Sequence, residues 1–548
     1  MTARTRAGAR TAAGPAPTDR RWTLAAALAG NAKRRAAHPA VVCEGRVLSY
    51  ARLHRESSRA AHALRAAGIG RGSRVAYLGR ESEHYYVTIL ACAKAGAVIV
   101  PVNWRLTAAE VEHVLRDSDA ELLFLDGEFA ATADTARSGA ALPKLHTVVR
   151  VDAVAEDGAR SCGAGLRAWY GDAPDTDPEP VTGPDDAVLQ IYTSGTTGLP
   201  KGVVLANRTF FTLPHAVAGT GADRDDWTDW RADDVSLISL PGFGIAGIGW
   251  FLHGMIAGAT NAVMPMYVAQ EAVRLIEELG VTITFAAPAM LQMMLDEPAA
   301  TPRAFASLRK IAYGAAPISE SLLLRSLEVF GCQLVQIYAS TEAGSVAVCL
   351  PPRDHRPGSP LLKAAGLPCP GNELKVIDDE GKELGPGQIG QVCVRTPARM
   401  IGYWNRPEAT AAALVDGWLL MGDAGYLDEH GYLFLCDRIN DTIIAAGQNI
   451  YPAEVEKQLG EHPDVVDAAV VGVPDARFGE AVHAAVVLRE GARVRPRELL
   501  LFLRGRIADY KIPFAYHFLD DLPRNPSGKI LRRTVREQLC EEARRAPA

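Results

Sequence analysis

Residues 192–202 read YTSGTTGLPKG and combine five hydroxyl side chains, three glycines and one lysine in eleven positions. Glycine allows the backbone to approach a ligand closely, and successive N–H groups together with Ser and Thr hydroxyls can donate to several phosphate oxygens. Lys201 adds a mobile positive charge, but Pro200 before it rules out the Gly-Lys-Ser/Thr ending of a P-loop. We interpret the stretch as a phosphate-binding loop, with a flexible polar linker as the alternative.

A strand must deliver such a loop, and the apolar run AVLQI at 187–191 is placed to do so. Other short apolar runs alternate with helix-like segments, which predicts α/β layers with largely parallel sheets. These runs are SRVAYLG (73–79), AVIVPVN (97–103), AELLFL (120–125), TITFAAP (282–288) and KIAYGAA (310–316). From about residue 372 the pattern changes to hairpins, among them YLDEHGYLFL with its turn at 429–431.

We therefore predict a large N-terminal domain of two layered α/β subdomains plus a small β-rich subdomain, followed by a small α+β C-terminal domain. The predicted boundaries are a disordered tail at 1–22, an N-terminal domain at 23–438 with its β-rich part at about 360–438, and a C-terminal domain at 439–548. We expect the segment 153–186, which is rich in Asp, Gly and Pro, to be a long surface connection.

Composition limits the class of protein. The chain has 548 residues, 48% of them hydrophobic, so it can bury more than one core. Its net charge of -6 lacks the basic footprint of a nucleic-acid-binding protein. Nine scattered cysteines with no C-x-x-C pair, and an N-terminus with no apolar core, indicate a cytoplasmic protein.

Residues 235–270 contain no Asp, Glu, Lys or Arg over 36 positions, which is long enough for a transmembrane helix. Glycines and prolines interrupt the run at short intervals, and VSLISL at its start is typical of a strand. We therefore predict a buried strand and helix beside an apolar pocket, and no integral membrane segment.

Several motifs follow in order along the chain and resemble the adenylate-forming superfamily, which contains acyl-CoA and aryl-CoA synthetases. They are YTSGTTGLPKGVVL (192–205), YGAAPIS (313–319), YASTEAG (338–344), GWLLMGDAGYLD (417–428), DRINDTIIAAGQNIYPAEVE (437–456) and NPSGKILRR (525–533). VPVNWRLTAAEVEHVL (101–116) is similar to bacterial fatty-acyl-CoA synthetases. Together the resemblance covers roughly residues 45–535.

The resemblance implies a two-step reaction and a C-terminal domain that moves between the steps. A carboxylic acid first attacks the α-phosphorus of Mg-ATP to give acyl-AMP and pyrophosphate, and the thiol of coenzyme A then displaces AMP. The expected ligands are ATP, Mg²⁺, coenzyme A and a carboxylic acid. An acyl carrier protein in place of coenzyme A is an alternative partner, and a homodimer stays open.

The resemblance also assigns roles to residues. Lys529, on the mobile domain, would bridge the acyl carboxylate and the α-phosphate, while Lys201 belongs to the phosphate loop. Glu342 and Thr197 would hold Mg²⁺, and Gly447 would line the pantetheine channel. The residues implied around the nucleotide are Thr193, Ser194, Gly195, Thr196, Thr197, Gly198, Gly314, Ala315, Ala316, Pro317, Tyr338, Thr341, Asp423 and Arg438. Tyr338 would stack on the adenine, and Asp423 would accept hydrogen bonds from both ribose hydroxyls.

The acyl pocket is predicted in the uncharged run, with Phe243, Gly244, Gly247 and Trp250 at its wall and Phe251 and Met255 as further candidates. Gly244 stands where many relatives carry a histidine or an aromatic ring. Because the run holds no acid to pair with an ammonium group, an amino-acid substrate is disfavoured. The glycine spacing favours a medium-chain or long-chain fatty acid, with an aryl acid as the competitor. A non-catalytic nucleotide-binding protein is the remaining class.

Overall fold

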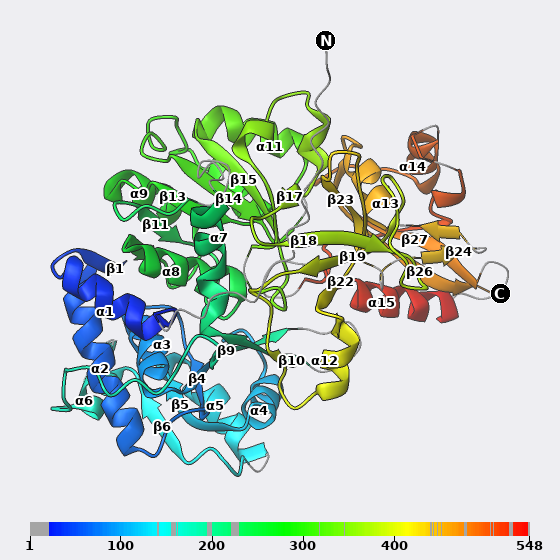
Figure 1. Ribbon diagram of the computed structural model, residues 1–548. Coiled ribbons are helices and arrows are strands. Elements are labelled where there is room, and N and C mark those ends of the chain that lie inside the picture. Colours follow the sequence, from blue (N-terminus) through cyan, green and yellow to red (C-terminus); the bar gives the residue numbers. More distant parts are fainter. Residues whose placement is uncertain are drawn as a thin grey trace.

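The computed structural model describes residues 21–545, except 140–141, 155–159, 162, 194–199, 221–228, 317, 345, 439–440, 442, 446–447, 451, 476–478, 505, 508 and 525–529. Two large sheets with helices between and outside them form the bulk of the molecule (Figure 1). The mixed α/β fold predicted from the sequence is confirmed.

One large sheet has seven strands and carries the predicted phosphate loop. Across the sheet they are β20 (Gly402–Tyr403), β10 (Lys201–Ala206), β9 (Ala187–Thr193), β4 (Val98–Val102), β3 (Arg74–Leu78), β5 (Ala120–Leu125) and β6 (Thr147–Arg150). From β9 to β6 neighbouring strands are parallel, whereas β10 is antiparallel to both β9 and β20. The three runs expected at 73–125 are therefore strands.

The other large sheet has nine strands. They are β17 (Leu367–Pro368), β16 (Val348–Leu350), β15 (Gln333–Tyr338), β14 (Lys310–Gly314), β13 (Ile283–Ala286), β11 (Val235–Ile238), β12 (Thr260–Val263), β1 (Pro39–Cys43) and β2 (Arg46–Ser49). Its central strands are parallel, so the carboxyl ends of β11, β13, β14 and β15 meet at one edge. Ligands of open α/β sheets bind at such an edge.

Helix α3 (Glu83–Ala95) lies between the two sheets and is buried along its whole length. It contacts α2 (Tyr50–Ala66) and α1 (Leu24–Arg34). Phe251 of α8 (Ile245–Ala257) stacks on Tyr86 of α3 with ring centroids 3.5 Å apart. One apolar core thus joins both sheets, and this explains why the run at 235–270 carries no charge.

Further helices cover the outer faces of the two sheets. The seven-stranded sheet is covered by α4 (Ala108–Asp117) and α5 (Ala130–Gly139). The nine-stranded sheet is covered by α9 (Ala269–Leu279), α10 (Pro288–Leu295) and α11 (Glu320–Phe330). Helix α7 (Thr212–Thr220) follows β10 along the chain, and helix α12 (Pro407–Ala413) contacts β20 and the strands β21 (Leu414–Val415) and β22 (Trp418–Leu427).

A smaller antiparallel sheet follows, coloured yellow in Figure 1. It contains β18 (Glu373–Ile377), β19 (Gly390–Arg395), β22 (Trp418–Leu427), β21 (Leu414–Val415) and β23 (Leu433–Arg438). The hairpin expected around residues 429–431 is confirmed, because Leu427 pairs with Leu433 and Gly431 has φ +84°.

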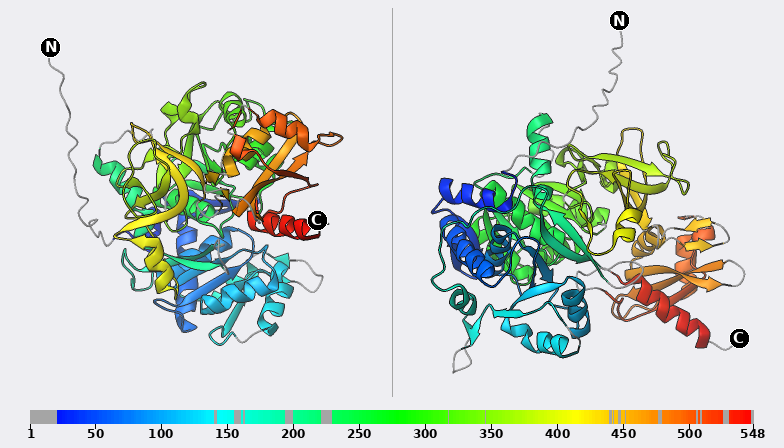
Figure 2. Two further views of the ribbon diagram at one scale, coloured as in Figure 1. Left: turned by 90° about the vertical axis from the view of Figure 1, so that its right-hand side faces the viewer. Right: turned by 60° about the horizontal axis from the view of Figure 1, so that its bottom comes forward.

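The last part of the chain builds a separate five-stranded sheet, which lies beside the yellow strands in the views of Figure 2. Its strands are β24 (Ile443–Ala445), β25 (Gln448–Ile450), β26 (Val465–Asp475), β27 (Gly479–Leu488) and β28 (Ala515–Phe518). Helices α13 (Pro452–Gly460) and α14 (Pro496–Leu503) pack on one face and α15 (Arg532–Arg545) on the other. The chain boundary at residue 439 stays a prediction.

Two expectations need correction. Trp22, which we assigned to a disordered tail, packs on His215 with ring centroids 4.8 Å apart, whereas residues 1–20 lie outside the described residues. The segment 153–186 is more than a connection, because it contains helix α6 (Ala164–Tyr170), which buries Leu166 and Tyr170. Among the described residues, no helix has the length and apolar character needed to cross a membrane.

Candidate active site

Strands β9 and β10 form the hairpin that carries the predicted phosphate loop. Thr193, the last residue of β9, pairs with Lys201, the first residue of β10. The loop therefore starts and returns at one point of the sheet. The carbonyl of Pro200 accepts a hydrogen bond from the His113 ring at 3.0 Å, which fixes the returning arm. Residues 194–199 lie outside the described residues, so the roles assigned to Ser194, Gly195, Thr196, Thr197 and Gly198 stay predictions.

Lys201 and Glu342 both contact Tyr403. The Lys201 ammonium lies 5.3 Å from the ring centroid of Tyr403 on β20. The Tyr403 hydroxyl donates to Glu342 Oε1 at 2.9 Å. Burial, together with the Glu342 carboxylate, raises the pKa of Tyr403, which keeps this hydroxyl a donor. The tyrosine thus holds the loop cation and the predicted metal-binding carboxylate in one cluster.

Glu342 is held from its backbone as well. It follows β15 in a tight turn, in which Ala343 N–H donates to Ser340 Oγ at 3.2 Å and Gly344 N–H donates to the Thr341 carbonyl at 3.0 Å. A glycine is required at 344, because its φ is +78° and a Cβ there would lie 2.2 Å from the Ala398 carbonyl. The turn presents the half-buried Thr341 and Glu342 side by side at the carboxyl end of β15.

The predicted adenine loop begins where the neighbouring strand β14 ends. Gly314 has no room for a side chain, because a Cβ would lie 2.2 Å from the Ile337 carbonyl. Ala315 adopts φ +65°, a left-handed conformation that is costly for a residue with a Cβ. Ala315 and Ala316 are exposed at this edge. Pro317 lies outside the described residues, so its place in the loop stays a prediction.

Tyr338 and Asp423 meet, although 85 positions separate them in the sequence. The Tyr338 hydroxyl at the end of β15 donates to Asp423 Oδ2 on β22 at 2.5 Å. The residues predicted to hold adenine and ribose therefore lie at one edge, next to the Gly314 loop. In the backbone pairing of β22 with β23, Asp423 stands opposite Arg438. This register places the Arg438 backbone at the same edge. Gly447 and Lys529 lie outside the described residues.

The predicted acyl side is organised by a buried carboxyl group that the sequence did not reveal. Glu81, which follows β3, accepts a hydrogen bond from Gly242 N–H at 2.6 Å. The Tyr85 hydroxyl donates to the Gly242 carbonyl at 2.8 Å, so both backbone groups of Gly242 are bound. Because Gly242 precedes α8, this contact ties the loop at the acyl side to the opposite sheet.

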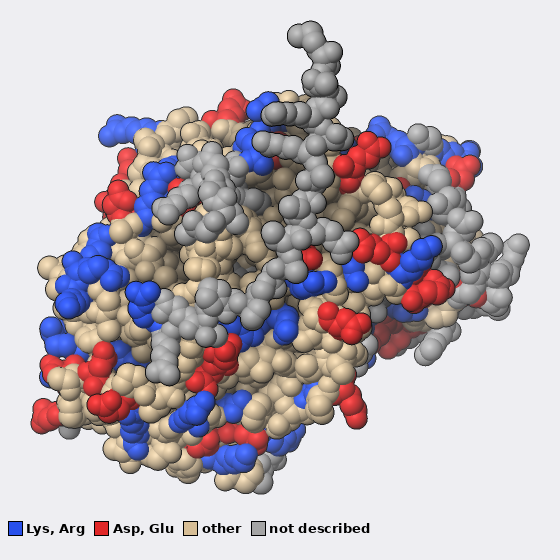
Figure 3. Space-filling model, viewed as in Figure 1, with Lys and Arg blue, Asp and Glu red and all other residues tan. Residues whose placement is uncertain are grey.

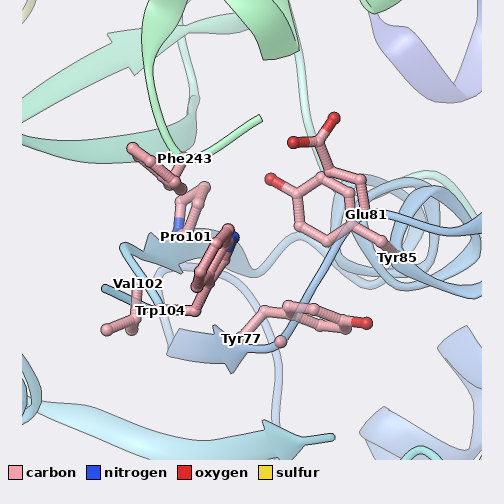
Figure 4. A pocket seen from close by; sticks show the side chains of 8 residues that line it. Tyr77, Glu81, Tyr85, Pro101, Val102, Trp104 and Phe243 are labelled. Atoms are coloured by element: carbon pink, nitrogen blue, oxygen red, sulfur yellow. The ribbon is translucent and has the colours of Figure 1, made fainter. Parts of the chain in front are cut away.

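A small cavity of about 10 Å³, room for roughly one water, lies beside this contact. Figure 4 shows its lining, in which Phe243 faces Trp104, Pro101 and Val102 while the Glu81 and Tyr85 side chains lie together. Burial raises the pKa of Glu81 to about 8, although the bonds from Gly242 and Tyr86 oppose this shift. At neutral pH Glu81 is therefore mainly protonated and is a poor partner for an ammonium group.

The other predicted acyl residues have mixed surroundings. Phe243 and Gly244 are half-buried on the loop, whereas a Cβ at Gly247 would lie 2.3 Å from the Pro241 carbonyl, so Gly247 serves close backbone packing. Trp250 is buried and donates its indole N–H to Ser236 Oγ at 3.0 Å. Phe251 and Met255 lie within the core. Gly247 is therefore needed for close packing, whereas a Cβ at Gly244 or Gly249 would meet no atom closer than 3.7 Å.

Tyr403, Glu81 and Tyr85 are the site residues that sequence reasoning missed. A tyrosine in an apolar stretch usually indicates core, and a glutamate after a strand usually indicates solvent. The one available signal was the polar run RESEH, which directly follows the apolar strand SRVAYLG and so lies at the carboxyl end of that strand, where Glu81 is found.

The donor set suits Mg²⁺. Glu342 is a hard oxygen donor beside the Thr341 hydroxyl, and Mg²⁺ usually needs only one or two carboxylates besides phosphate oxygens and water. No cluster of three or more His, Cys, Asp or Glu side chains that could hold an ion occurs within the described part of the chain. A single carboxylate with a neighbouring hydroxyl fits an ion whose other ligands are phosphate oxygens and water.

Comparisons with known proteins agree with this geometry. The family model "AMP-binding enzyme" matches residues 28–404, and "AMP-binding enzyme C-terminal domain" matches 454–529. The chain is 52% identical to the fatty acid–[acyl-carrier-protein] ligase ScoC of Streptomyces coeruleorubidus, over 95% of this chain and 98% of that protein. It is 39% identical to an indoleacetate–CoA ligase of Aromatoleum aromaticum, over 91% and 94%. The crystal structure of ATP-bound MatB from Rhodopseudomonas palustris superposes with TM-score 0.84 at 28% identity, over 95% and 99%.

Proposed function

The chain belongs to the AMP-binding enzyme family of acid–thiol ligases, and from this premise we propose that it joins a fatty acid to a phosphopantetheine thiol through an acyl-adenylate. The observation that carries the proposal is the Tyr338–Asp423 contact beside the Gly314 loop. It places an aromatic ring, a carboxylate and exposed backbone groups at one strand edge, which is what a nucleoside requires.

In the first step a carboxylate oxygen of the acid attacks the α-phosphorus of ATP, and the bond to pyrophosphate breaks. Both reactants are anions, so the site must supply fixed positive charge where negative charge develops. Lys201 supplies part of this charge at the hairpin, and Lys529 supplies it at the reacting carboxylate and α-phosphate. Thr341 contacts the same phosphate, while Asp423 orients the ribose.

Glu342 and Thr197 would hold Mg²⁺, which supplies positive charge to the phosphates. The Tyr403 hydroxyl orients the Glu342 carboxylate toward this task through its 2.9 Å hydrogen bond. Because one carboxylate oxygen is engaged by Tyr403, the group has one fixed orientation before the nucleotide arrives.

In the second step a thiol sulfur attacks the acyl carbon, AMP leaves with the electrons of the carbon–oxygen bond, and the thiol proton is lost. Gly447 would line the channel for the pantetheine arm. We propose an acyl carrier protein as the bearer of this arm, since the 52% identity to ScoC exceeds the 39% identity to the coenzyme A ligase. Free coenzyme A is the second candidate, supported by the latter relative.

We propose a medium-chain or long-chain fatty acid as the substrate. Phe243, Trp104 and Val102 offer an apolar lining at the cavity, and Glu81 is mainly neutral there at pH 7. An amino acid stays disfavoured, because the nearby acid engages Gly242 and Tyr86 instead of facing a free ammonium group. An aryl acid is the competitor.

The test compares pyrophosphate release with octanoate, palmitate, benzoate and coumarate, followed by mass detection of the product on coenzyme A and on a holo-acyl carrier protein. The proposal expects release with octanoate or palmitate and an acyl mass on the carrier protein. Preference for an aromatic acid would end the fatty-acid assignment, and acyl transfer to coenzyme A alone would end the carrier-protein assignment.

A further inference from the structure

The stretch 489–506 of the C-terminal domain is strongly basic within an acidic protein. It contains six arginines and two glutamates, whereas the whole chain has a net charge of -6. All six arginines are exposed. Blue atoms lie at the upper right of the surface in Figure 3, where Figure 1 places α14. This local excess of positive charge attracts an acidic partner.

Some of these arginines are neutralised within the domain. Arg495 pairs with Glu498 at 2.7 Å, and Arg506 pairs with Glu461 at 3.2 Å. Arg497 lies within α14, and Arg493 and Arg504 flank it. Across the parts of the chain that the structure describes, no ion pair involves any of these three. Their charge therefore remains available to a partner.

The exposed face of α14 combines this charge with an apolar side chain. Leu499 and Leu503 are fully buried against the C-terminal sheet. Arg497 and Leu501 lie one turn apart on the outward side, and Arg504 follows the last turn. Leu501 is 52% exposed, which leaves an apolar spot between two cations. A solvated helix has no need of a leucine there, whereas a docked helix would cover it.

This face belongs to the domain that is expected to serve the thiol. Leu499 and Leu503 of α14 share one apolar core with Ile443 of β24 and Ile450 of β25. The segment between β24 and β25 contains Gly447, the residue predicted to line the pantetheine channel. The basic face and the strands β24 and β25 therefore share one apolar core.

We propose that Arg497, Leu501 and Arg504 form the docking surface for an acidic helix of the acyl carrier protein that presents the pantetheine thiol. The inference rests on the proposed function, since it presupposes a carrier protein as acceptor. Opposite charge steers the encounter and fixes the orientation, and Leu501 provides the apolar contact at the centre. A small thiol such as pantetheine has no protein surface and gains nothing from this face.

The experiment compares the wild-type protein with Arg497→Glu/Arg504→Glu and with the control Arg303→Glu/Arg356→Glu. The control changes the charge equally at two exposed arginines of the large domain. Acyl transfer is measured to an acidic holo-acyl carrier protein and to free pantetheine, and pyrophosphate release is followed in parallel. We expect Arg497→Glu/Arg504→Glu to lower kcat/KM for the carrier protein by about tenfold or more, mainly through KM.

The loss should shrink at high salt, because ions screen exposed charges. Transfer to pantetheine and pyrophosphate release should match the wild type. An unchanged KM for the carrier protein, or an equal loss in the control, would overturn the docking surface while leaving the carrier-protein function standing. If the wild type transfers the acyl group to pantetheine but not to the carrier protein, the docking surface and the carrier-protein assignment both fail. A wild-type dimer that Arg497→Glu/Arg504→Glu dissociates in sedimentation would instead assign this face to a second copy of the chain.

Discussion

The nucleotide side and the acyl side of the candidate site are built on different principles. On the nucleotide side polar groups bind one another across the strand edge, as Tyr338 does with Asp423 and Tyr403 does with Glu342. On the acyl side both backbone groups of Gly242 are bound, and the adjoining cavity has room for about one water. The nucleotide side is thus held by hydrogen bonds before a ligand binds, whereas we expect an acyl chain to displace packed side chains.

This difference predicts different effects of mutations on the two sides. Preorganised groups need little rearrangement, so their loss should weaken nucleotide binding and adenylation directly. The acyl side must open, so changes there should alter stability and chain-length preference more than adenylation chemistry. Variants on each side therefore test whether the two sides differ in this way.

The largest effect is expected from Lys529→Ala. This change removes the ammonium that we propose to neutralise the approaching carboxylate and α-phosphate, and we expect adenylation to fall about 10² to 10³-fold. Thioester formation from supplied acyl-AMP should be largely spared, because it does not join two anions. Pyrophosphate exchange and single-turnover transfer measure the two steps, and equal loss of both would contradict the assigned role.

Asp423→Ala should follow. It removes the proposed ribose acceptor together with the carboxylate that accepts a hydrogen bond from the Tyr338 hydroxyl, so kcat/KM for ATP should fall about 10- to 100-fold. Tyr338→Phe keeps the ring and should cost less than about tenfold. Steady-state kinetics with varied ATP distinguish these variants, and a larger loss in Tyr338→Phe would contradict a stacking role for the ring.

Tyr403→Phe should have a smaller effect. It keeps the ring beside Lys201 but removes the donor to Glu342, so the magnesium concentration for half-maximal activity should rise about three- to tenfold. Tyr432→Phe is a matched control, because it removes a hydroxyl that donates to Asp354 at 2.8 Å. A shift of the same size in the control would show that the Glu342 contact is not specific.

Glu81→Gln should change stability with pH and leave nucleotide binding nearly intact. Burial raises the pKa of Glu81 from 4.5 to about 8, so this group stabilises the fold fully below pH 4.5 and progressively less as the pH rises to 8. The uncharged glutamine removes this dependence. The unfolding free energy of the variant minus that of the wild type should therefore be about 1 to 3 kcal/mol larger at pH 8 than at pH 5.

Urea unfolding at both pH values tests this prediction, with the exposed Glu277→Gln as control. A wild type and Glu81→Gln variant with parallel pH profiles would show that Glu81 is ionised in the native protein. In that case the acyl side would carry a buried charge, and the comparison with the nucleotide side would need revision.

The sequence indicated that Tyr338 and Asp423 belong to one site, whereas it did not indicate the burial of Glu81, and the reason is physical. Tyr338 is the last residue of β15 and Asp423 lies within β22, each inside a recognisable motif, and a hydrogen bond joins the two side chains. Glu81 becomes buried only because α3 lies between two sheets, a tertiary fact with no local signature. Gly247 was mistaken for pocket space because a sequence cannot show that its missing Cβ faces the Pro241 carbonyl.

The small elements show the same limit. Helix α6 is short and lies in a segment rich in turn formers, and tertiary contacts hold it: it buries Leu166 and Tyr170, and the Tyr170 hydroxyl donates to Glu56 Oε2 at 3.2 Å. Trp22 adjoins an arginine-rich stretch, and its packing on His215 depends on α7, nearly two hundred residues later. Local composition indicated neither contact.

Calorimetry with a non-hydrolysable fatty acyl-sulfamoyladenosine directly tests whether this strand edge binds an acyl-adenylate. Such a molecule fills both sides of the site at once. The account predicts one molecule bound per chain, at least about a hundredfold more tightly than ATP, with this advantage largely lost in Asp423→Ala. Binding no tighter than ATP, or binding unchanged in Asp423→Ala, would contradict the assignment of this strand edge to an acyl-adenylate.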